Sequence, residues 1–168
     1  MEAVDYLTRQ HREIEQALRD ALALADAAVR RSRFLDIADA LILHIASEEQ
    51  VFYPAVHADR NEAVLLESLE EHLGLKRLIA DLLALAADEV TFQPKLHVLR
   101  ELAEHHHGDE EKKLFPAVRE KLDASRREEL GREMQALQLR LQADGKPRRA
   151  VRDQTAAAQP LRQAVSRP

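Results

Sequence analysis

The sequence predicts an all-α protein, an up-down-up-down antiparallel four-helix bundle with an additional C-terminal helix. The composition is rich in Ala, Leu, Glu and Arg and includes only 4 Gly and 6 Pro in 168 residues, which favours helices. Apolar side chains recur at helical spacing through most of residues 1–143. The polar breaks between the first four helical stretches are short, and short connections favour antiparallel neighbours in a bundle.

The predicted helices of the bundle span residues 4–28, 32–57, 61–87 and 92–122. We assign residues 1–122 to the bundle, 123–143 to the C-terminal region with a fifth helix over 126–143, and 144–168 to a tail. Ser125, with Glu128 three residues later, has the pattern of a capping box at the start of the fifth helix. The tail is basic and lacks an apolar period, so we expect it to be disordered.

Composition and charge exclude several classes of function. The absence of Cys excludes disulfides, thiolate metal sites and cysteine nucleophiles. The net charge is −5 although the tail is basic, so the bundle is acidic, which argues against nucleic acid as a partner. No apolar run is long enough to span a bilayer, and residues 1–5 lack the basic start of a signal peptide. We therefore expect a cytoplasmic protein with no membrane partner; a protein partner would use the C-terminal helix or the tail.

An internal repeat links the second and fourth helices. Residues 44–54 and 106–116 both read H-x-x-x-E-E-x-x-[FL]-[YF]-P, at an offset of 62 residues. The first and third helices also correspond, because Gln10-His11 matches Glu71-His72. The chain therefore has the pattern of two helical hairpins of similar design.

The histidines and glutamates of this repeat fall on the apolar, inward stripes. The stripe of the second helix is Phe34, Ile37, Leu41, His44, Glu48, Val51 and Ala55. The matching stripe of the fourth helix is Leu96, Leu99, Ala103, His106, Glu110, Leu114 and Ala117. Carboxylates rarely enter a core unless they are paired or bound to metal, because the loss of their water costs several kcal/mol. Residues four apart share one helix face, so each H-x-x-x-E pair can present a nitrogen and an oxygen to one site.

These stripes predict a metal site where the four helices meet. The candidate ligands are His11, His44, Glu48, His72, His106 and Glu110. Imidazole and carboxylate groups suit iron, manganese or zinc. Glu49 and Glu111 follow the candidate glutamates; we expect them to face solvent or to accept the second ring N–H of a ligand histidine.

With these residues in place, the sequence resembles the hemerythrin-like family, or HHE cation-binding domains, over about residues 5–118. The resemblance implies a bundle that encloses two iron ions (Fe²⁺/Fe³⁺), oxo- or hydroxo-bridged. It also implies that the four histidines are terminal ligands and that Glu48 and Glu110 bridge the ions. The choice of iron rests on the resemblance, with zinc and manganese as substitutes.

One departure from the family pattern concerns the third helix. The oxygen-carrying members have a second histidine one turn after the third-helix ligand, and that position here is Lys76. A protonated lysine does not ligate metal, which argues against reversible oxygen carriage of that kind. The departure implies a more open coordination position or a replacement ligand. Glu15, one turn after His11, is a candidate, although the sequence also fits a surface glutamate there.

The run His105-His106-His107 leaves a second alternative open. His107 and Glu111 also form H-x-x-x-E and could replace His106 and Glu110. Glu104 and His107 form the E-x-x-H of ferritin-like di-iron proteins. The alignment anchored on the prolines selects His106 and Glu110.

Four functions are consistent with these residues. We favour a module that binds or senses oxygen, nitric oxide, peroxide or iron, because no general acid is obvious beyond the ligands. The alternatives are an enzyme that acts on peroxide or another small oxidant, a ferritin-like iron-handling protein, and a helical interaction protein with incidental histidines. Aromatic residues after the motifs are expected to seal the site, with Tyr53 as a candidate redox or hydrogen-bonding group.

Overall fold

Helices make up most of the chain, which we describe from a computed structural model of residues 1–162. The long helices are α1 (Ala3–Ala23), α2 (Ala27–Ser47), α4 (Glu62–Ala84), α5 (Phe92–Asp109) and α7 (Ala124–Ala143). The short elements are α3 (Tyr53–Val56), α6 (Phe115–Lys121), the π turns η1 (Glu48–Phe52) and η3 (Glu110–Leu114), and the 3-10 helices η2 (Asp59–Asn61) and η4 (Pro147–Gln154).

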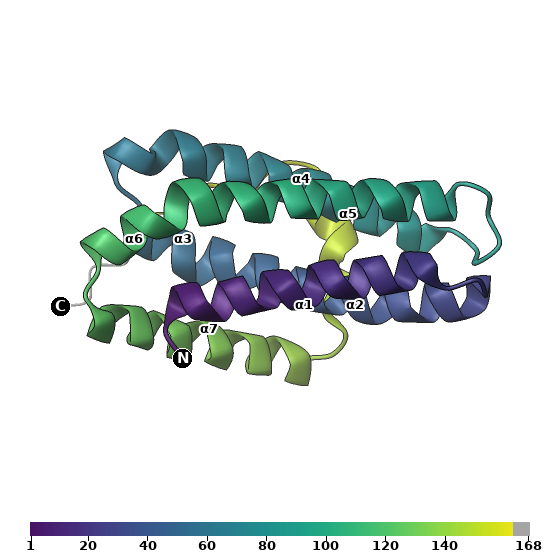
Figure 1. The fold of residues 1–168 in the computed structure, drawn as a ribbon, viewed down its shortest axis with the longest axis horizontal. Helices are drawn as coiled ribbons and strands as arrows, with labels where there is room; N and C mark the ends of the chain where they lie inside the picture. The colour runs from purple at the N-terminus through teal and green to yellow at the C-terminus, as the bar shows by residue number, and fades with distance from the viewer. Residues whose placement is uncertain (163–168) are drawn as a thin grey trace.

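Four helices close into a ring in which α1 contacts α2 and α5, while α4 also contacts α2 and α5. Successive helices of this ring run in opposite directions, and α7 lies along the outside of the bundle against α1 and α2 (Figure 1). The predicted all-α bundle with an additional C-terminal helix is therefore confirmed. Within the described residues, no helix is both long and apolar enough to cross a bilayer.

Helix boundaries differ from the prediction at two junctions, where an aspartate side chain caps the following helix. Asp26 accepts the backbone N–H of Val29, so α1 ends at Ala23 and α2 begins at Ala27 instead of at 32. Asp123 accepts the backbone N–H of Arg126 and begins α7. Ser125 therefore lies inside the first turn of α7, and the predicted capping box is wrong.

The π turns are the local consequence of the repeated motif. Each is followed by a proline, which lacks an N–H and whose ring would clash with the carbonyl four residues back in an α-helix. The backbone instead closes one wider turn, in which Tyr53 donates to the Glu48 carbonyl and Phe115 donates to the Glu110 carbonyl. Such turns are frequent at functional sites.

The extra residue in each π turn shifts the inward stripe that follows it. Phe52 and Val56 are buried, whereas Val51 and Ala55, which the stripe predicted, are only half-buried. In the second hairpin Val118 is buried in place of the predicted Ala117. The predicted stripe is therefore wrong at Val51, Ala55 and Ala117, whereas the predicted Leu114 is buried.

The tail is not disordered where the structure describes it, so that prediction is wrong for residues 147–154. The 3-10 helix η4 packs against α2 and α4. Val151 is fully buried and belongs to the same apolar cluster as Leu41 and Leu75. Arg148 forms an ion pair with Asp39 of α2, and its backbone N–H donates to Asp39 Oδ1 at 2.9 Å. The remainder of the predicted tail, residues 163–168, lies outside the described residues.

This packing predicts that the tail contributes to stability. Val151→Ala should lower the free energy of unfolding by about 1–3 kcal/mol, because it removes two buried methyl groups and leaves a cavity. Arg152→Ala, at the exposed neighbouring position, should change it by less than about 0.5 kcal/mol. Chemical denaturation monitored by circular dichroism measures both values. Equal, small effects of the two substitutions would contradict the docked tail.

Candidate metal centre

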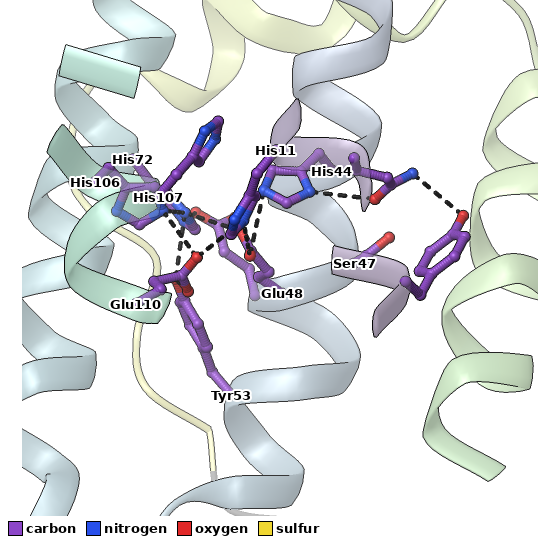
Figure 2. A network of polar contacts seen from close by, with 12 residues as sticks. His11, His44, Ser47, Glu48, Tyr53, His72, His106, His107 and Glu110 are labelled. Carbon is purple, nitrogen blue, oxygen red and sulfur yellow. Dashed lines mark hydrogen bonds and ion pairs between the residues drawn. The ribbon is translucent and has the colours of Figure 1, made fainter. Parts of the chain in front are cut away.

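Seven ionisable side chains meet in the middle of the bundle, between two apolar clusters. They are His11 from α1, His44 and Glu48 from α2 and its π turn, His72 from α4, and His106, His107 and Glu110 from α5 and its π turn. Each is at most 1% exposed. The structure thus brings together all six residues that the sequence predicted and adds His107. Figure 2 shows how the labelled imidazoles converge on the two glutamates.

Glu48 lies between histidines of different helices. Its Oε1 is 3.3 Å from His44 Nε2, and its Oε2 is 3.2 Å from His72 Nε2. The two carboxylate oxygens therefore face opposite sides of the cluster. A carboxylate with this placement can contribute one oxygen to each of two neighbouring ions.

Glu110 occupies the corresponding place in the second hairpin. Its Oε2 is 3.3 Å from His11 Nε2 and 3.7 Å from His106 Nε2. The Tyr53 hydroxyl donates to Glu110 Oε1 at 2.8 Å. Glu110 therefore also lies between the two sides of the cluster.

The histidines divide into two groups around these carboxylates. His11, His44 and His107 can place one nitrogen each within 4.8 Å of one another, and we call them the three-histidine side. His72 and His106 form the two-histidine side together with Glu48, and their Nε2 atoms are 2.9 Å apart. Each side has the donor types and the proximity to hold one metal ion.

Every one of the five imidazoles has an outer partner at Nδ1. The pairs are His11–Glu111 at 2.9 Å, His44–Gln10 at 3.2 Å, His72–Glu49 at 3.2 Å, His106–Glu71 at 2.8 Å and His107–Glu15 at 3.0 Å. A proton on Nδ1 satisfies the outer partner and leaves the lone pair of Nε2 directed inward. Metal-bound histidines in proteins are generally held in this way.

Several inward atoms lack a hydrogen-bond partner within the described residues. They are His11 Nε2, His44 Nε2, His107 Nε2, both carboxylate oxygens of Glu48, and Glu110 Oε2. A buried polar atom without a partner costs about 1–3 kcal/mol, and native proteins contain few of them. Nitrogen and oxygen donors about 2.1 Å from a shared ion lie about 3–4 Å apart, which agrees with the separations within the cluster. The residues therefore fit a pair of metal ions.

The electrostatics of the cluster also favour a cation. Burial would raise the pKa of Glu48, but the adjacent His44, His11 and His72 hold it well below its usual value. Burial and the negative charge of Glu48 raise the pKa of Glu110. Two carboxylates this close in a core repel each other when both are ionised, and a cation between them removes that repulsion.

Lys76 and Glu15 lie on the outer side of the histidines, where they contact Glu49 and His107. The buried Lys76 ammonium lies 2.7 and 2.8 Å from the two oxygens of Glu49, which in turn faces His72. Glu15 is not a surface glutamate, because it is 7% exposed, and its carboxylate contacts the outer nitrogen of His107.

His107 joins the buried cluster together with His106, whereas the sequence predicted it only as an alternative to His106. Neighbouring residues of a helix point about 100° apart, so both can face a cluster of two ions from one helix. The run His105-His106-His107 was the available signal. Glu104 forms an ion pair with Arg19 at 2.8 Å on the outside of the bundle, so the ferritin-like E-x-x-H is not assembled.

Similarity to known proteins agrees with this geometry. A protein from Nostoc sp. described as a DNA nickase is 25% identical over 142 residues, which cover 84% of this chain and 40% of that protein. The chain therefore spans 40% of the length of this curated relative. A crystal structure of a hemerythrin HHE cation binding domain-containing protein from Mycobacterium kansasii has 23% identity and a TM-score of 0.76, covering 90% of this chain and 97% of that chain. That likeness concerns the fold.

The family match covers the bundle itself. Residues 2–118 match the family described as the hemerythrin HHE cation binding domain. This range includes all seven side chains of the buried cluster and both π turns. The chain therefore belongs to the hemerythrin HHE cation binding domain family.

Proposed function

We propose that the chain holds two iron ions in the buried cluster and binds a small oxidant there, such as oxygen, nitric oxide or peroxide. The observation that carries this proposal is the meeting of five imidazoles and two carboxylates in the core. Within the described residues, inward atoms of five of these side chains lack a hydrogen-bond partner: His11, His44, His107, Glu48 and Glu110. Iron is favoured by the family resemblance, and manganese and zinc fit the same donors.

In this proposal, each side of the cluster binds one of the two ions. The three-histidine side would hold one ion, and His72 with His106 would hold the other. Glu48 and Glu110 would contribute to both. When bound, an iron pair supplies two redox-active centres that a small ligand can contact. The outer partners at Nδ1 orient the imidazoles for this role.

The two-histidine side is the place where a small ligand would enter, because fewer protein nitrogens occupy it. The Tyr53 hydroxyl reaches this side, 3.3 Å from His72 Nε2 and 2.8 Å from Glu110 Oε1. Burial, with the charges of Glu110 and Glu48, raises the pKa of Tyr53 well above its usual value. Tyr53 therefore stays protonated and can donate a hydrogen bond to a bound oxidant.

The surroundings restrict the size of such a ligand. The ring of Phe115 stacks on His11 with centroids 5.6 Å apart, and Phe52 is fully buried against Phe115. These apolar side chains separate the cluster from water on the side of α3 and α6. A diatomic molecule or peroxide suits this enclosure better than an organic substrate.

A peroxide-consuming enzyme is the second candidate, and Tyr53 is the observation that favours it. The sequence motifs indicate no obvious general acid beyond the ligands, whereas the buried Tyr53 hydroxyl lies beside the two-histidine side. The activity named for the Nostoc relative is not carried over, since this chain spans 40% of that protein.

Anaerobic loading with Fe²⁺ tests the proposal, and about two irons per chain are expected from the two groups of ligands. Oxidation of the bound iron to Fe³⁺ with peroxide, followed by addition of azide, should produce a charge-transfer band. Tyr53→Phe should retain both irons but bind azide about tenfold more weakly, because it removes one hydrogen bond worth about 1–1.5 kcal/mol. Wild-type protein that is folded and binds no iron would contradict the proposal. Sustained oxygen release from peroxide would select the enzyme over the binding module.

The three consecutive histidines provide matched substitutions in one helix. His106→Ala should remove the ion of the two-histidine side, and His107→Ala the ion of the three-histidine side, leaving about one iron per chain in each case. His105→Ala should leave both, because His105 is 62% exposed. Elemental analysis of the purified variants gives the stoichiometry. Full loading of the His107→Ala variant would exclude His107 as a ligand.

Metal affinity should rise with pH. Burial would lower the pKa of His72, but hydrogen bonds to Glu48 and Glu49 outweigh it and raise this pKa to about 9. Below pH 9 a metal ion must therefore displace a proton from His72, which weakens binding up to about tenfold for each pH unit. His44 has its pKa lowered to about 3, chiefly by burial, so it adds no such dependence. Zn²⁺ titrations between pH 6 and 8.5 measure the slope, and affinity independent of pH would contradict it.

A further inference from the structure

One imidazole of the cluster differs from the other four in its outer partner. In the described part of the chain, His11, His72, His106 and His107 each face a glutamate at Nδ1, whereas His44 faces the neutral amide of Gln10. A carboxylate attracts the Nδ1 proton by its charge, so it orients a histidine without help. An amide has one acceptor and one donor end, so Gln10 can orient His44 only if its own direction is determined.

That direction is determined by a chain of hydrogen bonds. The Ser47 hydroxyl donates to the Leu43 carbonyl at 2.9 Å, so its oxygen is left to accept from Gln138 Nε2 at 2.8 Å. With its nitrogen directed at Ser47, Gln138 presents Oε1 to the Tyr6 hydroxyl at 2.7 Å and to Gln10 Nε2 at 3.0 Å.

The nitrogen of Gln10 is thereby occupied by Gln138 and by the oxygen of Tyr6, at 3.2 Å. Its oxygen must then face His44 Nδ1, which lies 3.2 Å away. His44 consequently carries its proton on Nδ1 and directs the lone pair of Nε2 toward Glu48. Every donor in the chain has an acceptor, and reversing either amide would bring two donors or two acceptors together.

Gln138, which determines the direction of Gln10 in this series of hydrogen bonds, lies outside the four-helix ring. Gln138 belongs to α7 and is 8% exposed, although α7 itself packs on the outer surface of α1 and α2. It reaches inward while the neighbouring Met134 and Leu137 hold α7 against the bundle as buried apolar side chains. Gln138 connects α7 to Gln10 through two hydrogen bonds, at 3.0 and 3.3 Å.

We propose that Gln10 and Gln138 are positioning residues for His44, and that through them the docking of α7 is coupled to metal occupancy of the three-histidine side. The inference rests on the proposed metal binding. Metal on His44 favours the conformation of Gln10 that binds Gln138, so it stabilises docked α7. By linkage, docked α7 strengthens metal binding by the same factor. The C-terminal helix thus responds to the metal centre without touching it.

Metal titration tests the positioning role. Gln10→Leu should weaken binding of one of two Zn²⁺ ions about tenfold, as the loss of an outer partner usually does, and should leave the other ion unaffected. Gln10→Glu keeps an acceptor for His44 and should restore that affinity. Gln138→Leu should weaken the same ion by a smaller factor. Gln142→Leu, an exposed position one turn later on α7, is the matched control and should match the wild type.

Hydrogen–deuterium exchange tests the coupling. In the wild type, Zn²⁺ should slow amide exchange in α7 as well as in the bundle helices. In Gln138→Leu, Zn²⁺ should still slow exchange in the bundle helices, but the metal-dependent change in α7 should be lost. A residue that merely held α7 in place would alter exchange with and without Zn²⁺ to the same extent, leaving the metal-dependent difference intact.

The outcomes separate this inference from the proposed function. If wild-type protein binds no metal, the proposed function fails and this inference fails with it. If the wild type binds two ions while α7 exchange is unaffected by them, the coupling is wrong although the metal centre stands. If Gln10→Leu and Gln138→Leu bind both ions with wild-type affinity, the positioning role is wrong.

Discussion

The burial of Glu48 and Glu110 at the centre of the bundle is the constraint on which the rest of the structure depends. Ionised carboxylates in a core lose their water, and the five surrounding imidazoles compensate for this loss only in part, since several inward atoms have no hydrogen-bond partner among residues 1–162. Apolar clusters on both sides of the centre must therefore hold the helices together against this cost. Metal binding would remove the cost, so the site and the stability of the fold are linked through the same residues.

The repeated motif explains how one short sequence pattern supplies donors to the centre from two helices. Histidine and glutamate four residues apart share a helix face, and the proline after them forces the wider π turn. That turn carries the aromatic residues Phe52, Tyr53 and Phe115 into the core. The motif therefore encodes both the donors and the apolar side chains that cover them. Because Tyr53 adds a hydroxyl to one side only, the two sides of the centre differ.

The elements that the sequence predicted well are those with a regular signal. Helical spacing and the repeat predicted the bundle. They also predicted that six donor side chains meet at one place in it. Errors arose where a local feature interrupts a regular pattern: Asp26 begins α2 at a position where the apolar period would still continue the preceding helix, and a π turn shifts the stripe by one residue. The sequence predicted His106 or His107, because an alignment selects one of two adjacent histidines. The cluster contains two groups of histidines, so both residues can belong to it. The burial of Val151 was not predicted, because a single buried side chain in a basic segment produces no apolar periodicity.

The coupling between the metal centre and α7 depends on a residue that lies outside the matched domain. The family match ends at residue 118, before α7 begins, so the helix that reaches Gln10 from outside the ring lies beyond the matched domain. The matched domain supplies every candidate ligand and the glutamates that orient four of the histidines. The fifth, His44, depends on Gln138, which the additional helix provides. A glutamate at position 10 would orient His44 without α7, and the amide found there makes the orientation conditional on α7. The choice of a neutral residue at this one position is what allows the C-terminal helix to respond to the metal.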